Sequence, residues 1–349
     1  MIGAINDSDV RALSDAFRLY IVFSAIYMLL VIYVSNRDFY NIVLPVITVS
    51  SILIALISFY TVIDAAYNFG TIPLFVKDEM YLQAGIHDGY TQLNNINIGM
   101  YCFLISFLFS YFIMNKRKEN KIIIFALLLS VLAVFIASRR IVIILIVLVP
   151  ILSVIVDLFI TTRLNVALCA KVLKIYLVLA MFVFVMLSIN YYFDLFNTSG
   201  IVSRISDALI FDAGSARQTQ FQSLIDGFYK NPVVGSGFGG ETAVTRSAER
   251  PWNYELTYSK LLFNSGVIGV LLIFSLFSYY IFVTFKMLRI NNKQHSINVS
   301  LMVGFFSVLI ASASNPYLGP FDFLFVFAIP PLIISLIRKE RRIGASVYL

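Results

Sequence analysis

The sequence is poor in the residues from which soluble proteins build their surfaces, metal sites and disulfide frameworks. Charged residues make up 13% of the chain, compared with about 25% in an average soluble domain. The two histidines, His87 and His295, lie far apart in the sequence and predict no metal-ligand cluster. The two cysteines, Cys102 and Cys169, fall in or beside apolar segments, so they predict no disulfide framework.

Apolar residues, in contrast, are in excess. They form 60% of the 349 residues and give a mean hydropathy of +0.88. Since a membrane-spanning helix needs roughly 20 apolar residues, this content suffices for about nine or ten spans. The composition excludes a soluble enzyme, a disordered protein and a nucleic-acid-binding module. The net charge of +7 is explained by the Lys and Arg that membrane proteins carry on their cytoplasmic side. We therefore expect an all-α polytopic integral membrane protein.

Long apolar runs, separated by charged or turn-rich stretches, predict about nine transmembrane helices. Neither an internal repeat nor a low-complexity linker divides the chain, so residues 1–349 are predicted to form one membrane domain. The predicted spans lie near residues 19–34, 41–63, 96–114, 121–137, 141–160, 175–193, 261–285, 297–313 and 321–337.

The connections between these spans fall into two sets that differ in basic residues. One set carries 15 of the 26 Lys and Arg in about 50 residues, whereas the other carries 11 in about 127. The basic set is predicted to be cytoplasmic, and it includes the C-terminus. The N-terminus then lies outside, either as a short translocated tail or because a further span precedes it. The basic set comprises residues 35–40, 115–121, 161–174, 286–296 and 338–349.

Two of the predicted external connections are long enough to carry a function. They are a moderate loop at 64–95 and a large loop at 194–260. In the large loop, Ser215 and Gln218 have the spacing of a capping box, and apolar residues recur at helical spacing after them. These features predict an amphipathic helix over 216–229 that lies on the membrane or on the bundle. Its apolar stripe would consist of Phe221, Leu224, Ile225 and Phe228.

Arginines stand at two positions where an anion could bind. Arg217 lies at the start of the predicted helix, where backbone donors and the helix dipole also favour negative charge. The alternative is that Arg217 points outward or pairs with Asp212. Arg139 and Arg140 form, with Ser138, a short turn between two apolar spans. Because an arginine at mid-membrane depth is costly, this pair is predicted at the outer interface, where it binds either phosphate or lipid headgroups.

The end of the large loop places a carboxylate beside the following span. Glu255, Tyr258 and Leu262 have helical spacing, so Glu255 is predicted to stand at the outer membrane surface. It either takes part in chemistry or only complements the helix dipole. The sequence GSGFGG at 235–240 fits the pattern G-x-G-x-x-G, but the strand that a dinucleotide site needs is not predicted before it. We therefore expect no nucleotide cofactor.

Two of these elements resemble those of the O-antigen polymerase and O-antigen ligase family. Ser138 and Arg139, between two apolar spans over 128–144, are similar to the family's SRG element. The sequence GSAR at 214–217, followed by an amphipathic stretch and NPVVGSG at 231–237, is similar to the family's external loop. Their order, spacing and topology make the resemblance specific.

A third element distinguishes the two kinds of member. The ligases carry a histidine, one polar residue, nine further residues and G-x-x-G. In this chain the same register holds Glu255, Leu256, nine residues and GVIG at 266–269. Because Glu255 replaces the histidine and Leu256 the polar residue, the resemblance favours a polymerase of the Wzy type over a ligase.

The resemblance implies a GT-C-like glycosyltransferase on the periplasmic face of the bacterial inner membrane, with its active site in the loop 194–260. Such an enzyme polymerises repeat units of O-antigen or a related surface polysaccharide on undecaprenyl diphosphate, without a metal or another cofactor. Its implied partners are the lipid-linked donor and acceptor, membrane lipids and a chain-length regulator protein, and not nucleic acid. The implied catalytic base is Glu255, and the implied substrate-binding residues are Arg139, Arg140, Arg204, Arg217, Arg250 and Tyr258.

Two other functions stay open at this point. One is a ligase that moves finished glycan onto lipid A-core, which Glu255 disfavours. The other is a flippase for lipid-linked oligosaccharides, a transporter that would need polar or charged residues along its spans. The predicted spans carry almost no charge apart from Asp157 near a cytoplasmic end. This distribution favours an enzyme.

Overall fold

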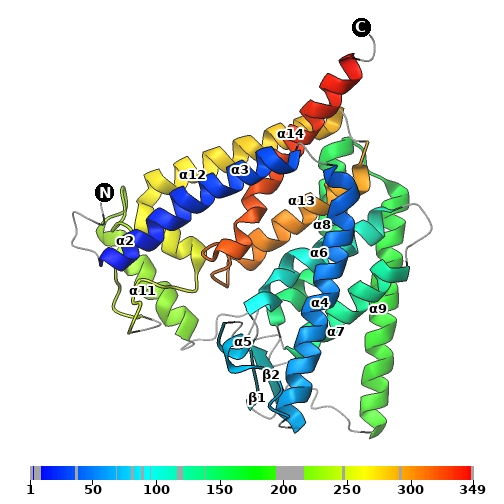
Figure 1. Ribbon diagram of the computed structural model, residues 1–349, viewed down its shortest axis with the longest axis horizontal. Coiled ribbons are helices and arrows are strands. Elements are labelled where there is room, and N and C mark those ends of the chain that lie inside the picture. Colours follow the sequence, from blue (N-terminus) through cyan, green and yellow to red (C-terminus); the bar gives the residue numbers. More distant parts are fainter. Residues whose placement is uncertain are drawn as a thin grey trace. The chain divides into compact units, whose positions relative to one another are not determined.

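A computed structural model gives the arrangement of the chain (Figure 1). It forms two compact units, and each is assembled from separate stretches of sequence. The first unit consists of Met1–Phe39, Phe211–Lys293 and Val308–Leu349, and the second of Tyr40–Ile210 and Gln294–Ser307. The structure describes residues 3, 9–35, 38–67, 69–79, 82–87, 90–94, 96–115, 121–137, 139–193, 216–245, 248–290 and 293–346.

Long apolar helices confirm the expected class, a helical membrane-embedded protein. Within the described ranges, six helices are long and apolar enough to cross a membrane, and the shorter apolar helices α7 (Lys121–Ile136) and α13 (His295–Ala311) accompany them. Each of the nine predicted runs lies on a helix, and the run near 175–193 lies on α9 (Val166–Phe193). The six long helices cover Val10–Ser35, Phe39–Tyr67, Asn97–Met114, Arg140–Thr161, Thr257–Ile290 and Phe321–Glu340.

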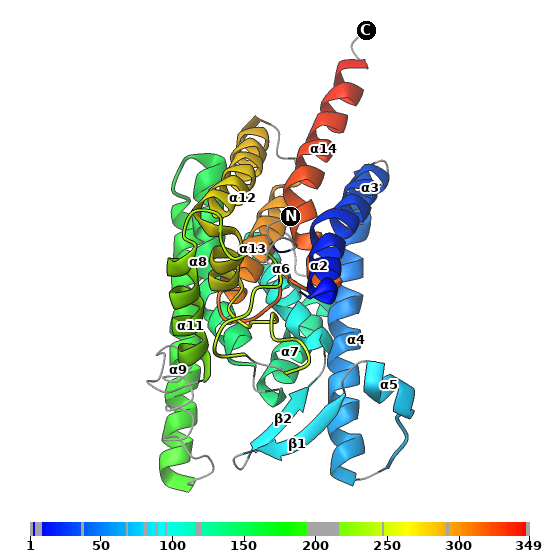
Figure 2. The ribbon, with the colours of Figure 1, turned by 90° about the vertical axis from the view of Figure 1, so that its left-hand side faces the viewer.

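In the first unit, α14 (Phe325–Ser346) lies between α3 (Ser24–Ser35) and α12 (Thr257–Ile290) and packs against both (Figure 2). The Nζ of Lys339 donates to the carbonyl oxygen of Ser35 at 3.1 Å, which fixes the ends of α3 and α14 together. These three helices form the apolar frame of the unit.

The chain enters this frame through a short amphipathic helix. α2 (Val10–Phe17) continues through the π-helix η1 (Arg18–Phe23) into α3. The Oδ1 of Asp9 accepts from the N–H of Arg11 at 2.7 Å and caps α2. The hydroxyl group of Tyr27 donates to the carbonyl oxygen of Phe321 at 2.9 Å, which joins α3 to the 3-10 turn η3 (Phe321–Phe323) before α14.

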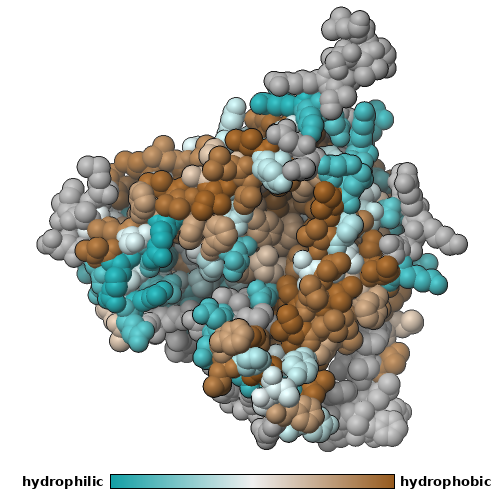
Figure 3. Space-filling model, viewed as in Figure 1, coloured by the Kyte–Doolittle hydropathy of each residue, from teal (hydrophilic) through white to brown (hydrophobic). Residues whose placement is uncertain are grey.

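Apolar side chains cover the outer surfaces of the long helices in this unit. In the most apolar stretch of Val10–Ser35 none of the residues is buried, and in that of Thr257–Ile290 only 6% of them are. Figure 3 shows the apolar side chains along α12 and α3 as a brown band, with hydrophilic side chains near α2 and α11. Extended apolar surfaces of this kind are suited to contact with lipid.

The second unit is built around α6 (Tyr101–Met114), of which all but two residues are buried. α6 packs against α7, α8 (Arg140–Thr161) and α9. A Cβ atom on Gly304 of α13 would lie 2.6 Å from the ring of Phe103, so this glycine lets α13 approach α6 closely. α6 is therefore the core of the unit.

The loop predicted at 64–95 contains local secondary structure that the sequence patterns did not predict. After α4 (Phe39–Tyr67) and α5 (Leu74–Glu79), the strands β1 (Gln83–His87) and β2 (Tyr90–Asn94) form an antiparallel hairpin in which Gln83 pairs with Asn94. The start of the loop folds around buried Asp64, whose Oδ1 accepts from the N–H of Thr71 at 2.9 Å. The Nζ of Lys77 lies 3.1 Å from the Oδ2 of Asp64. The expected all-α class therefore has one local exception.

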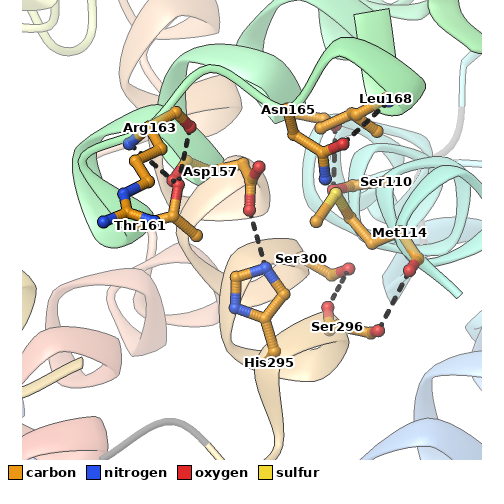
Figure 4. Close-up of polar contacts among 11 residues, drawn as sticks. Ser110, Met114, Asp157, Thr161, Arg163, Asn165, Leu168, His295, Ser296 and Ser300 are labelled. Atoms are coloured by element: carbon orange, nitrogen blue, oxygen red, sulfur yellow. Dashed lines mark hydrogen bonds and ion pairs between the residues drawn. The ribbon is translucent and has the colours of Figure 1, made fainter. Parts of the chain in front are cut away.

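Polar contacts join the ends of four helices in the second unit (Figure 4). The Nε2 of His295, at the start of α13, lies 2.6 Å from the Oδ1 of buried Asp157 on α8. The next residue, Ser296, donates to the carbonyl oxygen of Met114 at 3.2 Å. The Nζ of Lys171 on α9 donates to two carbonyl oxygens near the end of α6, each at 2.9 Å. The ends of α6 and α8 and the starts of α9 and α13 therefore lie on one side of this unit.

Candidate functional site

The described part of the loop 194–260 begins with α11 (Ala216–Lys230), which confirms the helix predicted over 216–229. Its buried face differs from the predicted apolar stripe. Gln220 and Leu224 are 5% and 0% exposed, whereas Phe221 is 41% exposed. The face that contacts α12 and the residues just before it consists of residues 217, 220, 224 and 227, which have helical spacing. The predicted cap, Ser215, lies outside the described residues.

Phe263 fills the junction between α11 and α12. Its ring meets the ring of Tyr254 edge-on, with 6.2 Å between the centroids. Gly227 of α11 leaves room for it, because a Cβ atom there would lie 2.6 Å from the Phe263 ring. Burial raises the pKa of Tyr254, so its hydroxyl group stays protonated at neutral pH and serves the packing. The buried cluster at this junction consists of Leu224, Tyr254, Leu256 and Phe263.

Two predicted site residues meet beside this cluster. The Nε of Arg217 donates to the Oε2 of Glu255 at 3.0 Å, although 38 residues separate them in the sequence. The main-chain N–H of Glu255 donates to the Oε1 of Gln220 at 3.0 Å, so α11 holds Glu255 through both its backbone and its side chain. The side chain of Arg217 is 49% exposed and that of Glu255 is 22% exposed.

Arg217 keeps capacity for another partner. Within the part of the chain that the structure describes, its hydrogen bond to Glu255 is the only one that its side chain makes. That bond uses Nε, and a guanidinium group has four further N–H donors on its two terminal nitrogens. Since the side chain is half exposed, these donors can reach an anion that arrives from solution.

A break in α12 anchors the loop that follows α11. Gly266, ten residues into the helix, has φ 61° and ψ −171° and interrupts the ladder of main-chain hydrogen bonds. The carbonyl oxygens of Phe263 and Asn264 accept instead from the N–H groups of Ser236 and Gly237, each at 2.9 Å. The sequence NPVVGSG at 231–237 is thus bound to α12 through its backbone.

The other side of the break is paired in the same way. The N–H of Val267 donates to the carbonyl oxygen of Pro232 at 2.9 Å, and the N–H of Ile268 donates to that of Val233 at 3.1 Å. Four main-chain hydrogen bonds therefore connect NPVVGSG with the part of α12 that contains GVIG. We call this arrangement the backbone interlock.

Two glycines make the backbone interlock possible. A Cβ atom on Gly235 would lie 2.5 Å from the main-chain carbon and oxygen of Asn264, and one on Gly266 would lie 2.5 Å from the nitrogen of Gly235 and the oxygen of Val233. Both also have positive φ angles, 73° and 61°. The two glycine motifs, about 30 residues apart in the sequence, therefore act as one structural element.

The remaining predicted residues are placed as follows. The hydroxyl group of Tyr258 donates to the carbonyl oxygen of Leu309 at 2.6 Å and ties α12 to the end of α13. Arg250 is exposed in the first unit. In the second unit, Arg139 is the N-terminal cap residue of α8 and Arg140 is its first residue, as expected for a turn between two apolar helices. Arg204 lies outside the described residues.

The N-terminal segment contributes to this region in a way that the sequence patterns did not predict. The guanidinium carbon of Arg11 lies 5.3 Å from the ring centroid of Trp252, and the rings of Tyr20 and Phe238 lie 4.9 Å apart. The sequence held one signal for such a contact, because Trp252 is the single tryptophan of the chain and stands in a polar loop. Gln220 was also missed, although it lies one helical turn after Arg217.

Among the described residues, no three side chains of His, Cys, Asp or Glu are grouped so that they could hold a metal ion. The expectation that the chemistry needs no metal stays a prediction. No protein-family model matches the sequence, and no curated protein and no solved structure is significantly similar to the chain.

Proposed function

We propose that this protein is a glycosyltransferase that polymerises glycan repeat units carried on undecaprenyl diphosphate. The contact between Arg217 and Glu255 carries the proposal, because a base and an anion-binding group stand together at 3.0 Å. The resemblance to O-antigen polymerases supplies the substrate. A GT-C-like fold, a place in the bacterial inner membrane, a periplasmic site and a chain-length regulator as partner belong to the same proposal.

In the proposed reaction, a glycan moves from one lipid carrier to a hydroxyl group of a second lipid-linked repeat unit. Glu255 accepts the proton of that hydroxyl group while its oxygen bonds to the anomeric carbon of the donor sugar. The bond between that carbon and the diphosphate breaks, and undecaprenyl diphosphate leaves with the electron pair. A positioned general base of this kind contributes about 10²–10⁴-fold to the rate.

Arg217 stabilises the leaving group in this scheme. Guanidinium groups bind phosphate oxygens in a planar, bidentate geometry. Negative charge on the diphosphate grows as the glycosidic bond breaks, so a cation fixed at that place lowers the barrier. We propose that Arg139, Arg140, Arg204 and Arg250 contribute to binding of the diphosphate and that Tyr258 lines the substrate site.

Purified protein in liposomes tests the proposal directly. Lipid-linked repeat units, extracted from cells that lack this protein, serve as both donor and acceptor. We expect a ladder of lipid-linked glycans with increasing numbers of repeat units, and one undecaprenyl diphosphate released for each bond formed. Heat-denatured protein is the control.

The same assay separates the alternatives. Transfer of glycan only when lipid A-core is added would indicate a ligase. Movement of intact repeat units across the liposome membrane without elongation would indicate a flippase. Either result would contradict the proposed polymerase.

A further inference from the structure

Four apolar side chains beside the backbone interlock are exposed together. Val233 and Val234 are 58% and 46% exposed, and Val267 and Ile268 are 43% and 49% exposed. The hydrogen bond from the N–H of Ile268 to the carbonyl oxygen of Val233 holds the two segments side by side. We call these four residues the loop-tip patch. Its position does not depend on the proposed function.

The loop-tip patch continues the apolar surface of α12. From Val267 to Phe285, α12 has 19 residues and none of them is charged. At 1.5 Å per residue this segment is about 28 Å long, close to the thickness of about 30 Å of the hydrocarbon core of a bilayer. Leu271 and Leu272, one turn further along, are 62% and 66% exposed. The break at Gly266 therefore matches the level at which the hydrocarbon core begins.

Residues typical of the membrane interface come directly before the loop. Tyr229 and Lys230 are the last two residues of α11, and both are exposed, Tyr229 at 71%. Tyrosine prefers the membrane–water interface, and lysine extends its ammonium group to the headgroups while its stem contacts apolar atoms. The patch is thus flanked by side chains that suit the headgroup layer.

The backbone of the loop also fits a place next to lipid, where polar main-chain groups need partners within the protein. The N–H groups of Ser236 and Gly237 and the carbonyl oxygens of Pro232 and Val233 are paired with α12. Pro232 has no N–H group to satisfy. The backbone interlock therefore lowers the cost of placing this loop at the lipid surface.

We propose that the loop-tip patch inserts into the lipid leaflet in which α12 begins, with the upper parts of the acyl chains as its occupant. The patch is continuous with the exposed apolar side of α12, and it carries no charge. Because four main-chain hydrogen bonds hold the backbone interlock together, the insertion would also fix the pair Arg217–Glu255 near the lipid surface. A substrate with a diphosphate on a lipid anchor presents its reacting bond at that level.

The test uses a fluorescent probe whose emission depends on the polarity of its surroundings. Single cysteines replace Val233 or Val234 in the full-length protein, in which Cys169 is replaced by serine while buried Cys102 is kept. The labelled proteins are reconstituted into liposomes of phosphatidylethanolamine and phosphatidylglycerol. Leu271→Cys, on the exposed side of α12, is the positive control, and Ala243→Cys, exposed in the same loop, is the negative control.

We expect the probes at Val233 and Val234 to be quenched by lipids that carry a nitroxide near the top of the acyl chain. Their quenching should approach that at Leu271 and exceed that at Ala243 several-fold, whereas iodide in the buffer should quench mainly the probe at Ala243. Equal behaviour of Val233, Val234 and Ala243 would overturn the proposal. A blue-shifted emission without quenching by the lipid nitroxide would also overturn it, because the patch would then be covered by protein.

Discussion

At the scale of single residues, the pair Arg217–Glu255 contributes too little to stability to explain its presence by folding alone. Its side chains are 49% and 22% exposed, and ion pairs between exposed side chains contribute about 0.2–1 kcal/mol. Loss of either partner should therefore leave the fold nearly intact. A large loss of activity in such a variant would report a role in the reaction.

The substitution Glu255→Gln tests whether this carboxylate is the base. It keeps the size of the side chain and its capacity to accept a hydrogen bond from Arg217, but it removes the basicity. We expect normal membrane insertion and normal binding of the lipid-linked donor, with polymerisation slower by about 10²–10⁴-fold. The measurement is the rate of chain elongation in liposomes.

Glu241→Gln, an exposed change in the same loop, is the control and should elongate glycan at the rate of the unchanged protein. Near-normal polymer length and amount from Glu255→Gln would exclude Glu255 as the base. The side chain would then be only a partner of Arg217 and of the helix that follows.

Replacement of Arg217 by lysine tests the need for a guanidinium group. Lysine keeps the charge but loses the planar arrangement of donors. Since a hydrogen bond to a charged group is worth about 1.5–3 kcal/mol, we expect elongation to fall roughly 10–100-fold at limiting donor. Arg163→Lys, in the exposed turn after α8, is the matched control. Full activity of both Arg217→Lys and Arg217→Ala would refute the assignment.

At the scale of elements, the backbone interlock explains why two glycine-containing motifs occur together. It joins NPVVGSG to the broken part of α12 by main-chain hydrogen bonds alone. Side chains at Gly235 and Gly266 would overlap with main-chain atoms, which cannot move aside as the end of a flexible side chain can. The loop is therefore held in one place relative to the pair Arg217–Glu255.

Gly235→Ala and Gly266→Ala should each loosen the backbone interlock. A left-handed conformation alone costs a residue with a Cβ atom about 1–2 kcal/mol, and the overlap adds to this. We expect a lower melting temperature for each variant and loss of elongation. Because both changes disrupt the same contact, the double variant should be less destabilised than the sum of the two.

Gly70→Ala separates the two contributions. Gly70 also has a positive φ angle, 63°, but a Cβ atom there would meet no other atom within 4 Å. We expect it to show the conformational cost alone. If Gly235→Ala is no more destabilising than Gly70→Ala, the close approach of NPVVGSG to α12 does not contribute to stability, and this prediction is wrong.

How far the sequence predicted these elements depends on the range of the interactions involved. The helix Ala216–Lys230 was predictable because its capping and spacing signals are local. Its buried face was predicted in part: Leu224 is buried as expected, but Phe221 is exposed and Gln220 is buried instead. Gln220 owes its burial to a bond with the distant N–H of Glu255, which the local pattern does not encode. The break at Gly266 was not predicted, since isolated glycines within a long apolar run are compatible with a continuous helix and the loop that stabilises the break lies about 30 residues away.

At the scale of the whole molecule, helix ends of the second unit gather in the groups that the alternation of basic and less basic connections predicted. In the second unit, the ends of α6 and α8 and the starts of α9 and α13 meet on one side, and all flank predicted cytoplasmic connections. Val62, Leu93, Ile98 and Ala137 cluster at the predicted external ends. Charge patterns could predict this alternation, whereas the division into two units depends on packing that the pattern does not encode.

Labelling of single cysteines tests the orientation that the proposed function requires. In the background with Cys169→Ser, cysteines replace Thr245 in the loop after α11 or Gln294 before α13, both of which are exposed. If the loop faces the periplasm, a membrane-impermeant maleimide should label Thr245→Cys in cells whose outer membrane is permeabilised. Gln294→Cys should react only after the inner membrane is lysed, because the basic connection 286–296 is predicted to be cytoplasmic. Labelling of Gln294→Cys alone in unlysed cells would invert the topology and place the pair Arg217–Glu255 on the cytoplasmic side, where it could not serve the proposed periplasmic polymerase.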